Sequence, residues 1–498
     1  MASARGTKRQ KVHEDGETEA DRFVAYLNES QSPFHCVDAV KRRLVAAGFT
    51  QLDERKPWEL ERGGKYFATR NGSSLIAFAV GGAFDPDSSG FIIIGGHTDS
   101  PCPKLKPISK LEKEGAHMLG VVGYGGGLWH TWFDRDLTVV GRALIRTAED
   151  RLEPRMVSVG RALCRIPTLA IHLSVGDERT TFKPNLESHF PPLLATEIKA
   201  ALWRDTKTMN GAPGEAGASS RHTPLLMSVV AEELGCEVSD IVDFELQLAD
   251  TQPSAIIGAC REFVSSGRLD NQGTCFTGTR GLIDSLDDGS LATDTSVRML
   301  TMFDHEEVGS LSAQGAQSPF FDETLARVSA ALGADFFSIK ARSFQISSDM
   351  AHAVHPNYSE RHDGKNRPRL HGGMVIKHNA NQRYATNSIG ASLIRRFAEL
   401  AGVPIQEFAV KADSGCGTTI GPITGAGTGI RTVDVGPPQL SMHSCREMMA
   451  TDDVVHAVQL FVAAYRSYST LSKTVEVDGP DPFWAAPGVG WGLKTTSH

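Results

Sequence analysis

Two side chains that can bind a metal ion follow a strand-like run of the sequence. Residues 91–94 read Phe-Ile-Ile-Ile and precede two glycines, a pattern that predicts a buried strand. His97 and Asp99 come directly after it, at the strand end where α/β proteins bind ligands. A single His-x-Asp is more often a buried histidine with an acidic partner than a metal ligand, so this pair needs support from elsewhere in the chain.

Four later segments also place carboxylates or imidazoles beside a predicted strand end or a tight loop. These segments are 267–271, 304–310, 347–352 and 441–444. With the first segment, they supply five oxygen and nitrogen donors and no thiolate: His97, Asp270, Glu307, Asp349 and His443. Such donors suit zinc, manganese or cobalt in a catalytic site that keeps one position open for water.

Composition narrows the classes of function. A chain of 498 residues is long enough for two domains, and its net charge of −8 gives no electrostatic support for nucleic-acid binding. No apolar run approaches the ~20 residues of a membrane span, and the N-terminus has no signal-peptide core. The eight cysteines are scattered without a CxxC pair, so we interpret even Cys416 and Cys445, near the ligands, as small buried residues. We therefore expect a cytoplasmic protein with no nucleic-acid or membrane partner.

The apolar patterns indicate elements on both sides of a distinct middle block. Residues 1–20 switch from basic to acidic and predict a disordered tail. Helices are predicted at 20–27, 37–45, 323–332, 391–400 and 453–468, with Asp322 and Asp452 as possible N-caps, and strands at 75–80 and 91–95. The Gly- and Pro-rich end, 478–492, is predicted to be extended.

The middle block, residues 102–252, is richer in short alternating runs. It is predicted to contain strands at 137–140, 168–173 and 244–248, a helix at 224–234 and a flexible loop at 210–220. The block separates His97 from the other four donors. We therefore predict a β-rich domain at 102–252 inserted into a catalytic domain formed by 21–101 and 253–498.

Five segments resemble, in order, the signature blocks of the M18 metallopeptidases, the aspartyl aminopeptidases. The segments are 97–101, 267–271, 306–310, 348–352 and 442–444. The resemblance implies an α/β catalytic domain with a mixed central sheet, an insert that builds dimer and larger subunit contacts, and a homododecamer. It also implies two zinc ions per subunit, replaceable by Mn²⁺ or Co²⁺, and removal of N-terminal Asp or Glu from peptides.

The resemblance also implies roles for the donors. Two nearby divalent ions repel each other unless an anion bridges them, and we choose Asp270 as that bridge. By resemblance, His97 and Asp349 complete one metal site, and Glu307 and His443 complete the other.

Two further acidic residues receive different roles. By resemblance, Glu306 is the general base that takes a proton from the bridging water and returns it to the leaving amine. Asp99 is expected to orient His97 without binding a metal.

Substrate recognition requires further groups, because an acidic side chain that leaves water must meet a cation or several donors. His172, His352, Lys377 and Tyr384 match positions that the family uses around the substrate. Without the resemblance, Lys377 is more typical of a surface lysine than of a substrate-binding residue. Since His172 lies in the insert, we expect it to act in the site of a neighbouring subunit.

Two residues depart from the family pattern, and two other functions stay open. His305 stands where a small polar residue is expected, and Gly415 where proline is common, which puts substrate preference in more doubt than reaction class. The alternatives are a dinuclear aminopeptidase of broader specificity for neutral N-terminal residues, and a non-catalytic self-assembling scaffold. A substrate panel distinguishes the first, and metal content the second.

Overall fold

The largest sheet of the molecule is mixed and has nine strands. The computed structural model describes residues 16–206, 218–475 and 477. The strand order is β1 (Thr50–Gln51), β2 (Lys65–Arg70), β3 (Ser74–Val80), β13 (Val297–Phe303), β4 (Phe91–His97), β14 (Phe344–Ser348), β18 (Arg431–Gly436), β16 (Met374–His378) and β17 (Ile405–Ala409). The central strands β13, β4, β14 and β18 are parallel, and β3 and β16 pair antiparallel to them. The predicted α/β class with a mixed sheet is confirmed.

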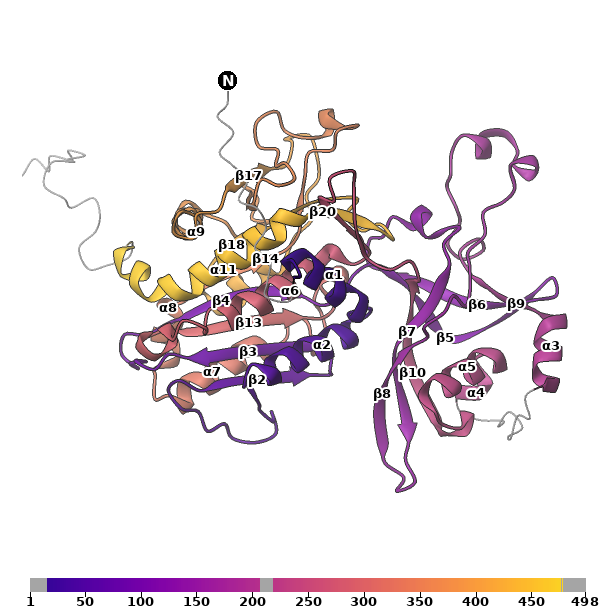
Figure 1. Ribbon diagram of the computed structural model, residues 1–498, viewed down its shortest axis with the longest axis horizontal. Helices are drawn as coiled ribbons and strands as arrows, with labels where there is room; N and C mark the ends of the chain where they lie inside the picture. Colours follow the sequence, from indigo (N-terminus) through magenta and orange to yellow (C-terminus); the bar gives the residue numbers. More distant parts are fainter. Residues whose placement is uncertain (1–15, 207–217, 476, 478–498) are drawn as a thin grey trace, which may run out of the picture.

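Helices cover both faces of this sheet (Figure 1), which explains why every residue of β4 is buried. Ile92 and Ile94 pack in one core, and Phe91 and Ile93 in another. The first core includes residues of α1 (Glu19–Glu29), α2 (Pro33–Ala46), α6 (Leu269–Asp284), α9 (Ser388–Ala401) and α11 (Thr451–Leu471). The second includes residues of α7 (Phe320–Ala331), α8 (Phe336–Ala341) and α10 (Ile420–Thr428). Burial on both faces fixes β4 and the position of His97 at its end.

The strands between Cys102 and Asp250 form a separate sheet with its own core, beside the nine-stranded sheet in Figure 1. Its order is β8 (Leu152–Ser158), β7 (Leu137–Arg146), β10 (Ile241–Asp250), β5 (Cys102–Lys113), β6 (Ala116–Tyr124) and β9 (Leu193–Thr196), all antiparallel. The same part of the chain holds α3 (Glu197–Thr206), α4 (Ala218–Arg221) and α5 (Pro224–Leu234). We refer to residues 102–252 as the insert.

A third, small sheet lies near the candidate ligands. It contains β11 (Ala255–Ile257), β12 (Phe263–Ser266), β20 (Glu447–Ala450), β19 (Pro438–Leu440) and β15 (Ala351–His352). Because β12 leads into Asp270 and β20 follows His443, pairing of these two strands brings both residues together. None of the described helices is long and apolar enough to cross a membrane.

One predicted strand is wrong. Residues 168–173 form a loop with a 3-10 helix at Ile171–Leu173, and no described strand pairs with it. The alternating residues Leu169, Ile171 and Leu173 are about 60–67% exposed, so their alternation does not reflect a core in this chain.

The predicted N-caps are also wrong. α7 and α11 begin after Pro319 and Ala450, which places Asp322 and Asp452 in the first turn. Acidic residues are favoured there because their negative charge interacts with the positive end of the helix dipole.

Several predictions fall partly outside the described residues. Residues 1–15 of the tail, most of the 210–220 loop and the 478–492 end lie there. Within the described part, Thr18 caps α1, and Ala218–Arg221 is helical where a loop was predicted.

Candidate metal centre and active site

The five predicted ligands converge at the carboxyl ends of the central parallel strands. His97 ends β4, Glu307 lies in a 3-10 helix after β13, Asp349 follows β14, Asp270 begins α6, and His443 lies between β19 and β20. This edge of an open α/β sheet is where ligands usually bind, because chain direction and loop geometry open a crevice there.

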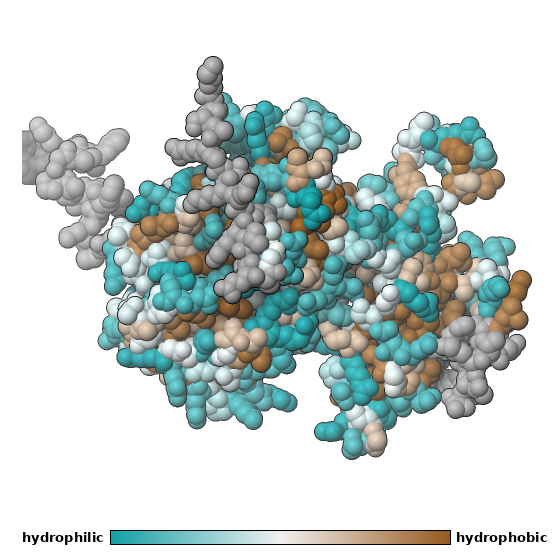
Figure 2. Space-filling view, in the orientation of Figure 1, coloured by the Kyte–Doolittle hydropathy of each residue, from teal (hydrophilic) through white to brown (hydrophobic). Residues whose placement is uncertain are grey.

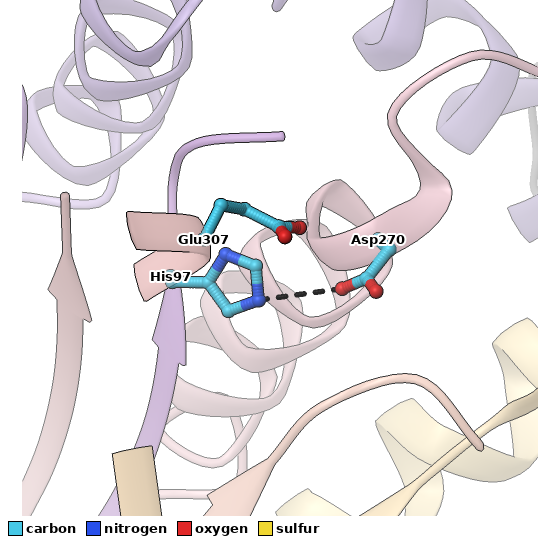
Figure 3. A group of neighbouring side chains, drawn as sticks. All are labelled: His97, Asp270 and Glu307. Atoms are coloured by element: carbon cyan, nitrogen blue, oxygen red, sulfur yellow. Dashed lines mark ion pairs between the residues drawn. The ribbon is translucent and has the colours of Figure 1, made fainter. Parts of the chain in front are cut away.

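Asp270 stands between two imidazoles, of which Figure 3 draws one, His97. Its Oδ1 lies 3.3 Å from His97 Nε2, and its Oδ2 lies 3.4 Å from His443 Nε2. Asp349 Oδ1 is 3.7 Å from His97 Nε2, and Glu307 Oε1 is 3.4 Å from His443 Nε2. The two oxygens of one carboxylate therefore face two different imidazoles.

The cluster has the chemistry of a cation site. Asp270 Oδ1, Glu307 Oε1 and Asp349 Oδ1 are buried without a hydrogen-bond donor. Buried carboxylate oxygens that lack a partner are costly, and a divalent cation satisfies several of them at once. His97, Asp270 and Glu307 offer ligand atoms within 4.8 Å of one another, as do His97, Glu306 and Asp349. The residues present therefore fit zinc.

Asp99 connects the two glutamates to His97. Its Oδ1 and Oδ2 each accept a backbone N–H at 3.1 Å, from Glu306 and Glu307 respectively. His97 Nδ1 lies 3.4 Å from Asp99 Oδ1 and 3.1 Å from its backbone oxygen. With Nδ1 directed to Asp99, Nε2 of His97 is left to face the other donors.

The groups of the cluster shift one another's protonation. Burial opposes the charge on His443, but Asp270 and Glu307 outweigh it and raise the His443 pKa to about 10. Burial raises the pKa of Glu306 to about 8, against the opposing charge of His97. A carboxylate that titrates near neutrality can accept a proton and release it again, as a general base must.

One supporting carboxylate was missed by the sequence reasoning. Glu447 Oε1 accepts the N–H of His443 at 2.7 Å, and its Oε2 accepts the N–H of Asp270 at 3.0 Å. It begins a strand and acts on backbone amides, so no ligand-like spacing marks it. Two further contacts carry no ligand-like spacing either. Tyr124 donates its hydroxyl to Asp99, and the backbone oxygen of Gly126 lies 3.0 Å from His443 Nδ1.

Of the four predicted substrate residues, Lys377 lies beside a predicted ligand, whereas His172 lies in the insert without a described contact to the cluster. Lys377 is buried, with Nζ 3.6 Å from Asp349 Oδ2 and 5.4 Å from the Tyr384 ring centroid. His352 is exposed, and its ring centroid lies 5.8 Å from that of Phe408. His172 is exposed in the insert loop, and no described contact joins it to the metal cluster.

The structure shows the surroundings of His305 and Gly415, the two residues that depart from the family pattern. His305 has a positive φ of 63°, and its Nδ1 lies 2.9 Å from Ser312 Oγ. A Cβ on Gly415 would meet nothing within 4 Å, and its φ is not positive, so this backbone does not require glycine. The cysteines are all free; Cys445 is buried and Cys416 is partly buried.

Known proteins resemble the chain over nearly its whole length. The family described as "Aminopeptidase I zinc metalloprotease (M18)" matches residues 26–465. A Ricinus communis protein named "Probable aspartyl aminopeptidase" is 47% identical over 475 residues, covering 92% of this chain and 96% of the relative. The "Aspartyl aminopeptidase" of Caenorhabditis elegans is 44% identical, covering 92% and 97%.

Solved structures agree with this comparison. The cryo-EM structure of the Ape4 and Nbr1 complex matches with a TM-score of 0.88 and 43% identity, covering 95% of this chain and 90% of that chain. The S. cerevisiae mApe1 dodecamer matches with a TM-score of 0.78 and 28% identity, covering 91% and 98%. All five ligand-bearing segments lie within the matched residues 26–465.

Proposed function

This chain belongs to the M18 family of zinc aminopeptidases, and we propose that it removes aspartate and glutamate from the N-termini of peptides, with Glu306 as general base. It is a metallopeptidase, and thus a hydrolase. Relatives of 41–47% identity that are named aspartyl aminopeptidases support the acidic specificity.

The position of Asp270 between two imidazoles is the observation that carries the proposal. It supports two zinc ions per subunit, with His97 and Asp349 on one side of Asp270, and Glu307 and His443 on the other. Mn²⁺ or Co²⁺ can substitute, since none of the five donors is a thiolate. When bound, such a pair of ions activates a water, polarises the scissile carbonyl and holds a free amino terminus.

The protein's own groups handle the proton. Glu306 Oε2 lies 3.9 Å from His97 Nε2, within the cluster. Its carboxylate takes a proton from the attacking water and passes it to the nitrogen of the leaving amine. Asp99 keeps the backbone of Glu306 and the ring of His97 in place during both transfers.

Lys377 supplies the positive charge that an acidic substrate needs. A chain with a net charge of −8 repels acidic peptides unless its pocket is locally positive. Lys377 Nζ is buried beside Asp349, so its charge is poorly screened at this position. We propose that it pairs with the substrate carboxylate, and that His352 and Tyr384 line the same pocket.

We further propose that the chain is a cytoplasmic homododecamer in which His172 reaches the site of a neighbouring subunit. The exposed loop that carries His172 and the dodecamer of the S. cerevisiae relative support this proposal. Residues 102–252 would then act as an oligomerisation domain.

The test is a panel of peptides with N-terminal Asp, Glu, Leu or Ala. We expect efficient hydrolysis of the first two only, with loss of activity on chelation and recovery with zinc. Lys377→Met should lower kcat/KM for Asp peptides by at least tenfold, whereas exposed Lys473→Met, far from the cluster in the sequence, should not. Equal rates on Leu and Asp would reject acidic specificity and favour the broader aminopeptidase.

A further inference from the structure

The insert contacts the metal cluster of its own chain through residues 124–128. This segment joins the end of β6 to a 3-10 helix at Trp129–Trp132. The Tyr124 hydroxyl donates to Asp99 Oδ2 at 2.6 Å. The same carboxylate oxygen accepts the Glu307 N–H, so a side chain of the insert holds the group that orients the glutamates.

The same segment also holds His443. His443 Nδ1 lies 3.0 Å from the backbone oxygen of Gly126, which can only accept, so Nδ1 carries the proton. In return, Leu128 N–H donates to the His443 carbonyl at 2.9 Å. These two bonds direct His443 Nε2 toward Asp270 and Glu307, and leave it free to bind a metal once it is deprotonated.

A glycine is required between these two contacts. Gly125 has a φ of +75°, and a Cβ there would lie 3.1 Å from the Glu307 Cβ. The segment therefore packs directly against a ligand residue, and only glycine combines this backbone conformation with that approach.

Tyr124 itself is fixed from the insert side. Lys104 Nζ, on β5 of the insert, lies 3.6 Å from the centroid of the Tyr124 ring. This contact within the insert helps to hold the ring, and with it the hydroxyl, in place.

We propose that residues 124–128 are a structural part of the metal centre, with Tyr124 and Gly126 as positioning residues for Asp99 and His443. The insert then has a second task besides assembly: it sets the affinity for zinc within its own chain. This inference rests on the proposed ligand set. It concerns groups that never touch the metal but fix which ring nitrogen and which oxygen face it.

Tyr124→Phe is the primary test, because it removes one hydroxyl and keeps the ring. We expect zinc affinity, measured by competition with a coloured chelator, to fall about 10-fold or more, the usual effect of losing such a partner. We expect kcat to fall by a similar factor, with KM within about twofold. Tyr468→Phe is the matched control, since it loses a hydroxyl bond to the Arg342 carbonyl outside the cluster, and should keep the parent's zinc affinity.

Gly125→Ala is an independent variant, because the added Cβ would lie too close to the Glu307 Cβ and displace it. It should also weaken zinc binding while light scattering shows the parent's assembly. Parent-like zinc affinity in both variants overturns the inference, as does zinc loss confined to dissociated protein. Glu307→Gln separates failure of the ligand set from failure of this inference. If Glu307→Gln binds zinc like the parent, the ligand set is wrong. If it loses zinc while neither Tyr124→Phe nor Gly125→Ala does, only the inference is wrong.

Discussion

At the scale of single residues, the carboxylates of the site differ in what their oxygens face. Asp270 faces two imidazoles, and Glu447 faces two backbone amides. Asp99 faces two backbone amides, the His97 ring and the Tyr124 hydroxyl. Glu306 and Glu307 are adjacent in sequence, yet only Glu307 lies beside His443. The different roles that we propose for these two glutamates rest on which groups their carboxylates face, since their positions in the sequence are adjacent.

Exchanging each of the adjacent glutamates for glutamine should affect zinc content differently. Glu306→Gln keeps the ligands but cannot accept a proton, so we expect normal zinc content and a loss of about 10²–10⁴-fold in kcat. Glu307→Gln should lose part of the bound zinc. Elemental analysis and steady-state kinetics measure both effects, and an active Glu306→Gln enzyme would contradict the role of base.

Zinc affinity should increase with pH. Without metal, the His443 pKa is about 10, because Asp270 and Glu307 outweigh the effect of burial. At any pH below that value, a proton must leave before the ring can bind zinc, so binding is weaker at pH 6 than at pH 8. Titration against a chelator at several pH values checks this, and a flat or falling affinity would show that His443 is not a ligand.

The convergence of the five proposed ligands was predictable because each follows a recognisable strand or loop signal. His97 follows an apolar run, and Asp349 follows β14. The supports were not predictable, because Tyr124 acts through a hydroxyl, Gly126 through a backbone carbonyl and Glu447 through backbone amides. Such partners depend on which segments the fold brings together, and a single sequence carries no periodic signal for that.

At the scale of elements, the position of the metal ligands depends on tight contact between strand ends. Gly436 ends β18, and a Cβ there would lie 1.7 Å from the backbone oxygen of Asp349. The strand register thus fixes Asp349 only because the neighbouring residue has no side chain.

Gly436→Ala should therefore damage stability and metal binding together. The added methyl must separate β14 from β18, which we expect to cost about 1–3 kcal/mol of unfolding free energy. Gly427→Ala is the control: this exposed position in α10 has space for a Cβ, and alanine there favours the helix by up to about 1 kcal/mol. Thermal unfolding and zinc titration compare the two variants, and a stable Gly436→Ala protein with parent-like zinc affinity would refute the argument.

The apolar patterns predicted elements well where a core surrounds them. The strands at 91–95 and 244–248 and the helix at 224–234 are present as β4, β10 and α5. The pattern at 168–173 was misleading because its apolar residues are exposed in the single chain. Alternating apolar residues indicate that one face of a segment will be buried, but they do not indicate which part of the molecule will cover it.

At the scale of the whole molecule, the loop that carries His172 brings several exposed apolar side chains together. Ile171, Leu173 and Val175 are 59–69% exposed, and Figure 2 shows brown residues at the end of the loop that projects beyond the six-stranded sheet. Large apolar side chains gathered on one loop are typical of an interface.

Charge placed on this loop should dissociate the assembly. We expect Leu173→Asp to shift light scattering toward smaller species and to lower activity, because the exposed apolar contact is lost. A mixture of His172→Ala and Glu306→Gln subunits should recover some activity, since some contacts then pair an intact His172 with an intact Glu306. A fully active monomer, or a mixture with no recovery, would reject the cross-subunit role.

The order of strands in the central sheet also determines when the enzyme can first exist. β4 is made early, but both of its neighbours, β13 and β14, lie beyond the insert, and His443 comes later still. During synthesis the apolar strand of residues 91–94 must wait unpaired, at risk of aggregation, until those partners leave the ribosome. The donor set is completed by almost the last strands to emerge, so a nascent or interrupted chain contains no working peptidase.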